Sequence, residues 1–316
     1  MASTGEMGVG SPGTGVDQAS PQSAALDTEQ PAPVPRYRSA GQIVLRQFVR
    51  NRGAVVGLAI VALCVLLAIV GPLLTPHDPL EQDLSQAFKP PSLARPLGTD
   101  ELGRDTLTRL LHGSRITLLI TLGAVALSLL LGGGIGLVAG FYGGRVDNLS
   151  MRAMDILMAM PGFLLAIAVI AALGAGTVNL IVAVAAVSIP PFARIARAST
   201  LSVRNQDYIL AARASGAPNS RLMAGHVLPN ITAPLTVQTS LRMATAILTA
   251  SGLSFLGLGP APPTPEWGAM LSTGRKFITS HAELATYPGL AILFVTLGFN
   301  LLGDGLRDAL DPRLRR

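Results

Sequence analysis

The chain has 316 residues, of which 49% are hydrophobic and 13% are charged, and its mean hydropathy is +0.49. These values exclude an ordinary soluble domain and indicate a polytopic membrane protein. A net charge of +6 in a soluble protein would suggest a nucleic-acid partner. In a membrane protein, arginine and lysine instead collect on the cytoplasmic loops, so we expect no nucleic-acid partner.

The N-terminal segment, residues 1–40, is rich in Gly, Pro and Ser and lacks the pattern of a secretory signal. We expect a disordered cytoplasmic tail there. In residues 41–52, Ile43, Val44 and Phe48 share one side of a helix and the arginines lie elsewhere, which predicts an interfacial helix. The open alternative is that these arginines are only the positive flank of the first membrane span.

Apolar runs long enough to cross a hydrocarbon core of roughly 30 Å, which takes about 20 residues, predict six transmembrane helices. The domain that contains them covers residues 53–310, and 311–316 are expected to form a cytoplasmic tail. In the third run, Pro161 interrupts one helical hydrogen bond and allows bending. The third and fourth runs are separated only by a turn, which predicts a tight hairpin. The runs are 53–75, 115–141, 153–174, 177–198, 231–258 and 286–306.

The second run carries Gly132, Gly136 and Gly140 at every fourth position. This spacing favours close packing against a neighbouring helix. Just before the run lies the polar segment PLGTDELGRDTLTRLLHGSRITL, which starts at Pro96. Taken singly, its polar residues would form turn caps and local ion pairs. As a set, we expect them to shape the outer entrance of a membrane pathway; the candidates are Asp100, Gly103, Arg104 and Asp105.

The distribution of basic residues predicts that both termini are cytoplasmic. With that orientation, sixteen basic residues lie in inner segments and seven in outer segments, which leaves Arg242 inside the fifth span. An ionisable group at that depth is costly unless it faces a partner or a water-filled cavity. Arg242 is therefore a candidate for a substrate pathway, with a substrate carboxylate as one partner. The alternative, that Arg242 lies near an interface or is paired within the protein, stays open.

The connector between the fourth and fifth spans, residues 199–230, is polar and helix-forming. Asp207 and Tyr208 open its helical part, in which Ala211 and Ala212 leave one face nearly flat. A flat face permits close docking in a groove of a partner protein. We therefore expect this connector to contact another subunit.

A sharp turn is predicted after that helix. Gly216 can take the left-handed conformation that ends it, and Pro218 prevents its continuation. Asn219 or Ser220 is expected to cap the next helix. The pattern as a whole predicts helix, turn and helix at the membrane surface.

The spacing of Ala211-Ala212, Gly216 and then Leu228-Pro229 resembles the EAA loop of ABC-importer permeases. The segment from Pro96 resembles C-type subunits of dipeptide, oligopeptide and nickel permeases, and similar segments cover nearly everything after residue 40. This resemblance implies an all-α, six-helix type I permease fold whose cytoplasmic coupling helix docks on an ATPase. The implied coupling residues are Asp207, Tyr208, Ala211, Ala212, Arg213, Gly216 and Pro229.

The resemblance also implies partners: a homologous B-type permease in a pseudo-twofold pair, two ABC ATPase subunits, an extracytoplasmic solute-binding protein and the lipid of a bacterial cell membrane. Its implied activity is uptake of di- or oligopeptides by alternating access, with ATP and Mg held by the ATPases. The chain itself has no G-x-x-x-x-G-K-[ST] phosphate loop, no H-E-x-x-H metal motif and no G-x-S-x-G nucleophile turn. We therefore expect a non-catalytic subunit that binds no metal or other cofactor.

Two positions depart from the family pattern: Leu210 stands where glutamate is frequent, and Ala250 where an acidic residue is common before LSFLGLG. The chain does not separate peptides from nickel chelates or other small solutes. An autonomous secondary transporter is the alternative from another class; it would be expected to show inverted repeats or polar clusters at mid-membrane.

Overall fold

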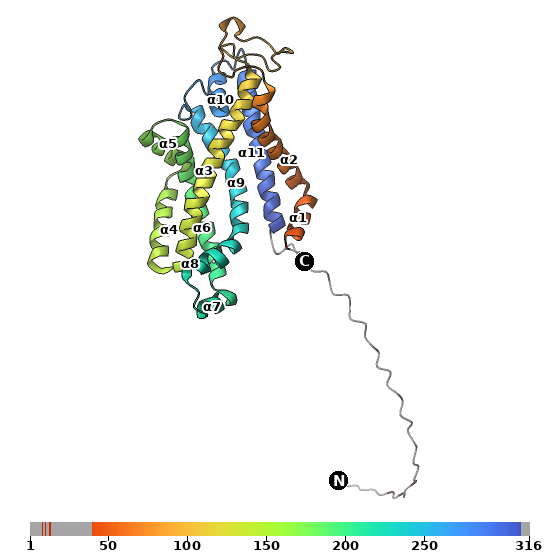
Figure 1. The fold of residues 1–316 in the computed structure, drawn as a ribbon, viewed down its shortest axis with the longest axis vertical. Helices are drawn as coiled ribbons and strands as arrows, with labels where there is room; N and C mark the ends of the chain where they lie inside the picture. The colour runs from red at the N-terminus through yellow and green to blue at the C-terminus, as the bar shows by residue number, and fades with distance from the viewer. Residues whose placement is uncertain (1–7, 9, 11–12, 14–39, 311–316) are drawn as a thin grey trace, which may run out of the picture. The chain divides into compact units, whose positions relative to one another are not determined.

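The computed structural model describes residues 8, 10, 13 and 40–310. The predicted tails, 1–40 and 311–316, lie almost wholly outside these residues. The chain divides into two units, Met1–Arg38 and Ser39–Arg316, and the elements below all belong to the second. Within 40–310 the regular elements are helices (Figure 1), together with one isolated bridge between Thr99 and Asp105. The all-α prediction is confirmed for this part of the chain.

The helices follow the predicted order. They are α1 (Ala40–Arg50), α2 (Arg52–Leu74), the 3-10 turn η1 (Leu84–Gln86), α3 (Thr106–Tyr142), α4 (Gly144–Ala159), α5 (Gly162–Leu173), α6 (Thr177–Arg204), α7 (Asp207–Ala214), α8 (Asn219–Leu222), the π-helical turn η2 (Met223–Val227), α9 (Leu228–Phe255), α10 (Trp267–Arg275) and α11 (Glu283–Leu310).

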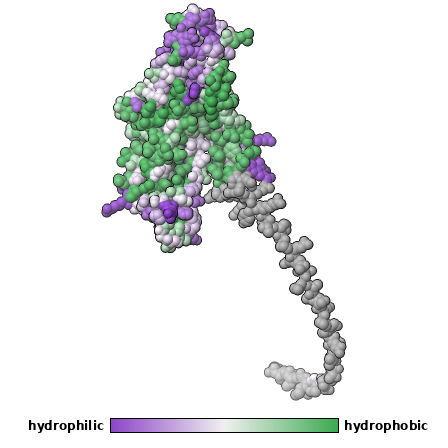
Figure 2. Space-filling view, in the orientation of Figure 1, coloured by the Kyte–Doolittle hydropathy of each residue, from purple (hydrophilic) through white to green (hydrophobic). Residues whose placement is uncertain are grey.

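Among the described residues, α2, α3, α6 and α11 are long and apolar enough to cross a membrane, and α4 with α5 would make a fifth span. The fifth predicted span, 231–258, coincides with α9, which has the length but is less apolar because hydroxyl side chains and Arg242 lie along it. α9 nevertheless packs against α3, α6 and α11. Figure 2 shows an apolar band around the middle of this unit, between hydrophilic ends.

The third predicted span is not one helix. α4 and α5 meet at a bend of 94°, with Met160 extended and Pro161 at the N-cap of α5. A proline disfavours helical geometry in the residue before it, so α4 ends ahead of Met160. The bend that the sequence allows at Pro161 is therefore a full break.

The second span starts earlier than predicted, at Thr106 rather than residue 115. The reason is local: the Asp105 carboxylate caps the helix by accepting from the backbone N–H of Thr108 at 2.8 Å. α3 consequently extends from the outer polar segment through the whole apolar band.

α3 and α6 are in close contact through the glycines that the sequence singles out. A Cβ added at Gly132 would lie 2.4 Å from the Ile189 carbonyl oxygen, and one at Gly136 would lie 2.2 Å from that of Ala193. Such distances leave no room for a side chain, so the two helix backbones touch. The close packing predicted from the glycine spacing is thus present, and Phe192 is fully buried beside it.

α1 occupies most of the range where an interfacial helix is predicted. Phe48 is buried against Ala54 and Ala309, while Leu45 and Val49 are exposed. Asn51 then caps α2, and its amide donates to Asp308 of α11 at 3.0 Å. α1 is thereby fixed to the end of α11; its place at a membrane surface stays a prediction.

Candidate functional site

The connector after α6 forms the predicted helix, turn and helix. α7 ends in a turn where the N–H groups of Ser215, Gly216 and Ala217 donate to carbonyls of the last turn of α7. Gly216 has φ +84°, the left-handed conformation expected of it. The expectation that Asn219 or Ser220 caps α8 is wrong, because Pro218 occupies the N-cap and no side chain caps that helix.

Three apolar side chains attach the connector to the bundle. Ile209 of α7, Leu222 of α8 and Val227 of η2 are fully buried. The Tyr208 ring contacts the His226 ring edge-on at 6.5 Å between centroids. The connector is therefore part of the folded unit and has one inward face and one outward face.

The last turn of α3 provides a further attachment. Arg204, at the end of α6, donates to the carbonyls of Gly140 and Phe141 at 2.8 and 3.1 Å. Arg213 of α7 lies over the Phe141 ring, 5.5 Å from its centroid. A guanidinium at a helix C-terminus satisfies carbonyls that have no partner within the helix. The ends of α3, α6 and α7 are thus held together.

Most of the predicted coupling residues lie on the outward face. Asp207, Tyr208, Ala211, Arg213 and Gly216 are exposed, whereas Ala212 is half-buried against the core. Leu210, where the family frequently has glutamate, is 48% exposed. Pro229 is exposed at the second position of α9. Small side chains beside a glycine turn therefore form a surface on which another protein could dock closely.

Two ion pairs join α4 to α6. Arg197 forms a two-point pair with Asp147, with 2.6 Å between Nη2 and Oδ2, and Asp147 is largely buried. Arg194 pairs with Asp155 at 2.6 Å, and both side chains are about half exposed or more. Sequence reasoning found neither pair, because their members are 50 and 39 positions apart.

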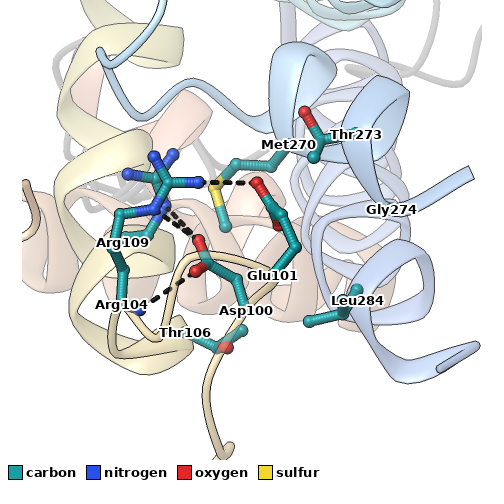
Figure 3. Close-up of a pocket in the computed structure, with 9 residues that line it drawn as sticks. All are labelled: Asp100, Glu101, Arg104, Thr106, Arg109, Met270, Thr273, Gly274 and Leu284. Carbon is teal, nitrogen blue, oxygen red and sulfur yellow. Dashed lines mark hydrogen bonds and ion pairs between the residues drawn. The ribbon is translucent and has the colours of Figure 1, made fainter. Parts of the chain in front are cut away.

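The four predicted outer-entrance residues are all buried, and Figure 3 shows two of them, Asp100 and Arg104, pointing toward each other. Asp100 accepts from Arg104 Nε at 2.6 Å and lies 3.3 Å from Arg109 Nε, while Glu101 accepts from Arg104 Nη2 at 2.8 Å. Arg109, absent from the predicted set, also donates to the carbonyl of Pro79 at 2.9 Å. We call Asp100, Glu101, Arg104 and Arg109 the outer charge cluster, after the side of the membrane that the sequence predicts for this segment.

Together with Thr106 and residues of α10 and α11, the cluster lines a cavity of only about 30 Å³, about the space of one water molecule. Gly103 turns the chain beside it with φ +74°, and a Cβ there would lie 1.8 Å from the Asp83 carbonyl oxygen. Asp105 caps α3. The cluster therefore fixes the segment between α2 and α3 to the start of α3, and its side chains neutralise one another.

Glu266 is a buried carboxyl group that sequence reasoning missed. It is 1% exposed, accepts from the Thr117 hydroxyl at 3.1 Å and caps α10 by accepting from the Ala269 N–H at 2.9 Å. Burial raises the pKa of Glu266 above its ordinary value, and the hydrogen bonds that it accepts oppose this shift. The neighbouring Trp267 indole donates to the Leu110 carbonyl at 2.9 Å. α10 is thereby joined to α3.

Arg242 lines a recess of about 220 Å³ formed by α4, α5, α6 and α9. Its side chain is half-buried and has no hydrogen bond or ion pair within the described part of the chain. Among residues 40–310, Arg242 therefore does not have the ion-pair partner that one of the alternatives predicts. Ala250, the second departure from the family pattern, is on α9 and is buried in the core.

Comparisons with known proteins agree with this architecture. Residues 132–316 match the family model of the binding-protein-dependent transport system inner membrane component. Residues 39–91 match that of the N-terminal TM domain of oligopeptide transport permease C. The second match covers α1, α2 and part of the loop between α2 and α3, and the first begins within α3.

Several curated proteins are similar over most of their length. The chain is 48% identical over 276 residues to the Di/tripeptide transport system permease protein DppC of Pseudomonas aeruginosa, covering 85% of this chain and 91% of that one. It is 43% identical to the Dipeptide transport system permease protein DppC of Alkalihalophilus pseudofirmus, over 92% and 96% of the two chains. It is 44% identical to the Glutathione transport system permease protein GsiD of Pectobacterium atrosepticum, over 85% and 90%. The chain therefore belongs to the family of binding-protein-dependent transport system inner membrane components, and it is a multi-pass membrane protein.

Proposed function

We propose that this chain is a permease subunit of an ATP-driven ABC importer for short peptides. The observation that carries the proposal is the outward face of α7 and its glycine turn, in a chain 48% identical to a di/tripeptide permease. The names of the relatives above favour peptides over nickel chelates. The same likeness favours an importer subunit over an autonomous secondary transporter.

The proposed assembly contains a homologous B-type permease, two ABC ATPase subunits and an extracytoplasmic solute-binding protein. ATP and Mg would bind to the ATPases, so this chain would perform no catalysis itself. The excess of basic residues in the inner segments supports cytoplasmic termini and a cytoplasmic position for the α7 connector. The outer charge cluster would then lie at the entrance, on the side of the solute-binding protein.

The mechanism that we propose is alternating access. Closure of the ATPase dimer on ATP moves the docked connector. α3 and α6 follow, because Arg213 of α7 lies over the Phe141 ring of α3 and Arg204 of α6 donates to the last turn of α3. An equilibrium between two states shifts only if a ligand binds them differently. The surface around Ala211 and Gly216 would provide that difference for the ATPases, and Arg242 would face the substrate pathway.

The test is affinity purification of the tagged chain from its native membrane, followed by reconstitution and uptake of labelled Ala-Ala with ATP inside the vesicles. We expect a second permease and ATPases to co-purify, and uptake to require both ATP and the solute-binding protein. A chain recovered alone that transports without an ATPase would overturn the proposal in favour of an autonomous transporter.

A further inference from the structure

Three helix irregularities meet at one recess. α4 ends at Ala159 and α5 starts at Gly162, so the helix is interrupted between these residues. α6 carries Pro190 and Pro191 in its interior. Residues from all of these segments line the same recess as Arg242. The recess is thus a place where regular helical hydrogen bonding is interrupted on two sides.

On one wall is an unpaired cation. Arg242 stands near the middle of the 28-residue α9, and within residues 40–310 nothing neutralises its guanidinium. The ion pairs of Arg194 and Arg197 on α6 are already complete. A charged group at such a depth is expensive unless a partner or water reaches it. A carboxylate is the partner that suits a guanidinium best, because two parallel hydrogen bonds can form.

The helix segments that form the other walls include backbone carbonyls whose usual helical donors are missing. The last carbonyls of a helix have no partner within it and carry its negative end. For Leu157 the expected donor would be residue 161, a proline, and no hydrogen bond from α5 reaches Leu157 or Met158 in the described chain. On α6, Pro190 and Pro191 have no N–H to donate to the carbonyls of residues 186 and 187, and residue 187 lines the recess.

We propose that this recess binds a short peptide by both ends at once. Its carboxylate would bind to Arg242, and its terminal ammonium would donate to the free carbonyls of α4 and α6. A volume of about 220 Å³ is below the roughly 300–1,000 Å³ of sites for drug-sized ligands, which suits a dipeptide. The inference rests on the proposed function, since it names how that site recognises its substrate.

Cysteine protection tests the site directly. Cys64 is the single cysteine, so Cys64→Ser gives a background in which Met160→Cys reports on the recess and Thr236→Cys, exposed on the same α9, reports elsewhere. The chain, with the subunits that it retains, is treated with N-ethylmaleimide in the presence of Ala-Ala, N-acetyl-Ala-Ala or Ala-Ala amide. Labelling of residue 160 is expected to slow with Ala-Ala, and to need about tenfold more peptide when either end is blocked.

Substitutions of Arg242 complete the test. Arg242→Gln should raise the Ala-Ala concentration needed for protection about tenfold and abolish discrimination against the amide, while discrimination against the acetylated peptide persists. Arg242→Lys should restore part of the protection. The proposal would be overturned if Ala-Ala gave no protection or if all three peptides protected equally. Equal protection of residues 160 and 236 would also overturn it. Peptide uptake by the unmodified complex is measured separately. Uptake without protection would overturn the proposed site alone, whereas absence of uptake would overturn the importer assignment.

Discussion

Gly136 of α3 and Ala193 of α6 are in backbone contact: a Cβ on Gly136 would lie 2.2 Å from the Ala193 carbonyl oxygen. That carbonyl belongs to helix backbone and cannot rotate away as a flexible side chain would. The whole of α6 would have to move to admit one methyl group. The identity of residue 136 therefore sets the distance between these two helices.

Gly136→Ala is expected to lower stability by about 1–3 kcal/mol, the usual cost of overpacking. Gly134→Ala is the matched control on the same helix, because a Cβ there meets nothing within 4 Å. Thermal unfolding in detergent should show a lower midpoint for the first variant and an unchanged or slightly higher one for the second. Equal midpoints would contradict the assigned contact.

Gly216→Val is expected to lower peptide uptake per ATP hydrolysed. The site has open space, but φ +84° is strained for valine by roughly 1–3 kcal/mol, so the turn that positions α7 should shift. Gly225→Ala is the control, since that position also has open space and needs no positive φ. Parallel ATPase and uptake assays check this, and normal uptake by Gly216→Val would remove the coupling assignment.

Leu210→Glu is expected to leave the complex intact, because Leu210 is 48% exposed and its side chain does not contribute to the core. The neighbouring Ile209→Glu should fail to assemble, since it would place an unpaired charge at a fully buried position. Co-purification of the ATPases checks both variants. Loss of the complex with Leu210→Glu would show that this face does not tolerate a carboxylate.

Arg197→Gln is expected to lower stability by about 1–3 kcal/mol, because it leaves the largely buried Asp147 without its charged donor. Arg194→Gln, one turn earlier on α6, should cost about 0–1 kcal/mol, since its pair with Asp155 is exposed. A thermal-unfolding comparison with the double variants of each pair separates these effects. Equal losses from both arginines would contradict the difference in burial.

Glu266→Gln is expected to reduce the pH dependence of stability. Because burial raises the pKa of Glu266, the folded state binds this proton more tightly than the unfolded state. The stability that protonated Glu266 contributes to the folded state is thus fully present below the ordinary carboxyl pKa of about 4.3. It is lost as the pH rises through the raised pKa. Unfolding midpoints across this range should fall less steeply for Glu266→Gln than for the exposed control Glu81→Gln. Parallel curves would contradict this reasoning.

Local features could be predicted from the sequence because they depend on neighbouring residues. The left-handed Gly216 and the glycine spacing of α3 follow from backbone sterics, and the main helices follow from apolar runs. Buried pairs could not be predicted, because Thr117 meets Glu266 across 149 positions. The sequence predicted that the polar residues around Asp100 shape an entrance, with local ion pairs as the reading of each residue alone; their burial and the third partner, Arg109, could not be predicted from local sequence. The proline at 161 predicted a bend but not its size, which depends on how α5 packs against α6.

α3 contains 37 residues, which at 1.5 Å per residue gives a rod of roughly 55 Å. One end starts at the Asp105 cap beside the outer charge cluster, and the other ends in carbonyls held by Arg204. In the proposed orientation, a single stiff lever then reaches from the entrance to the docking surface. A movement of α7 would therefore displace the far end of α3 as well, because α3 is one continuous helix with no break that could bend in between.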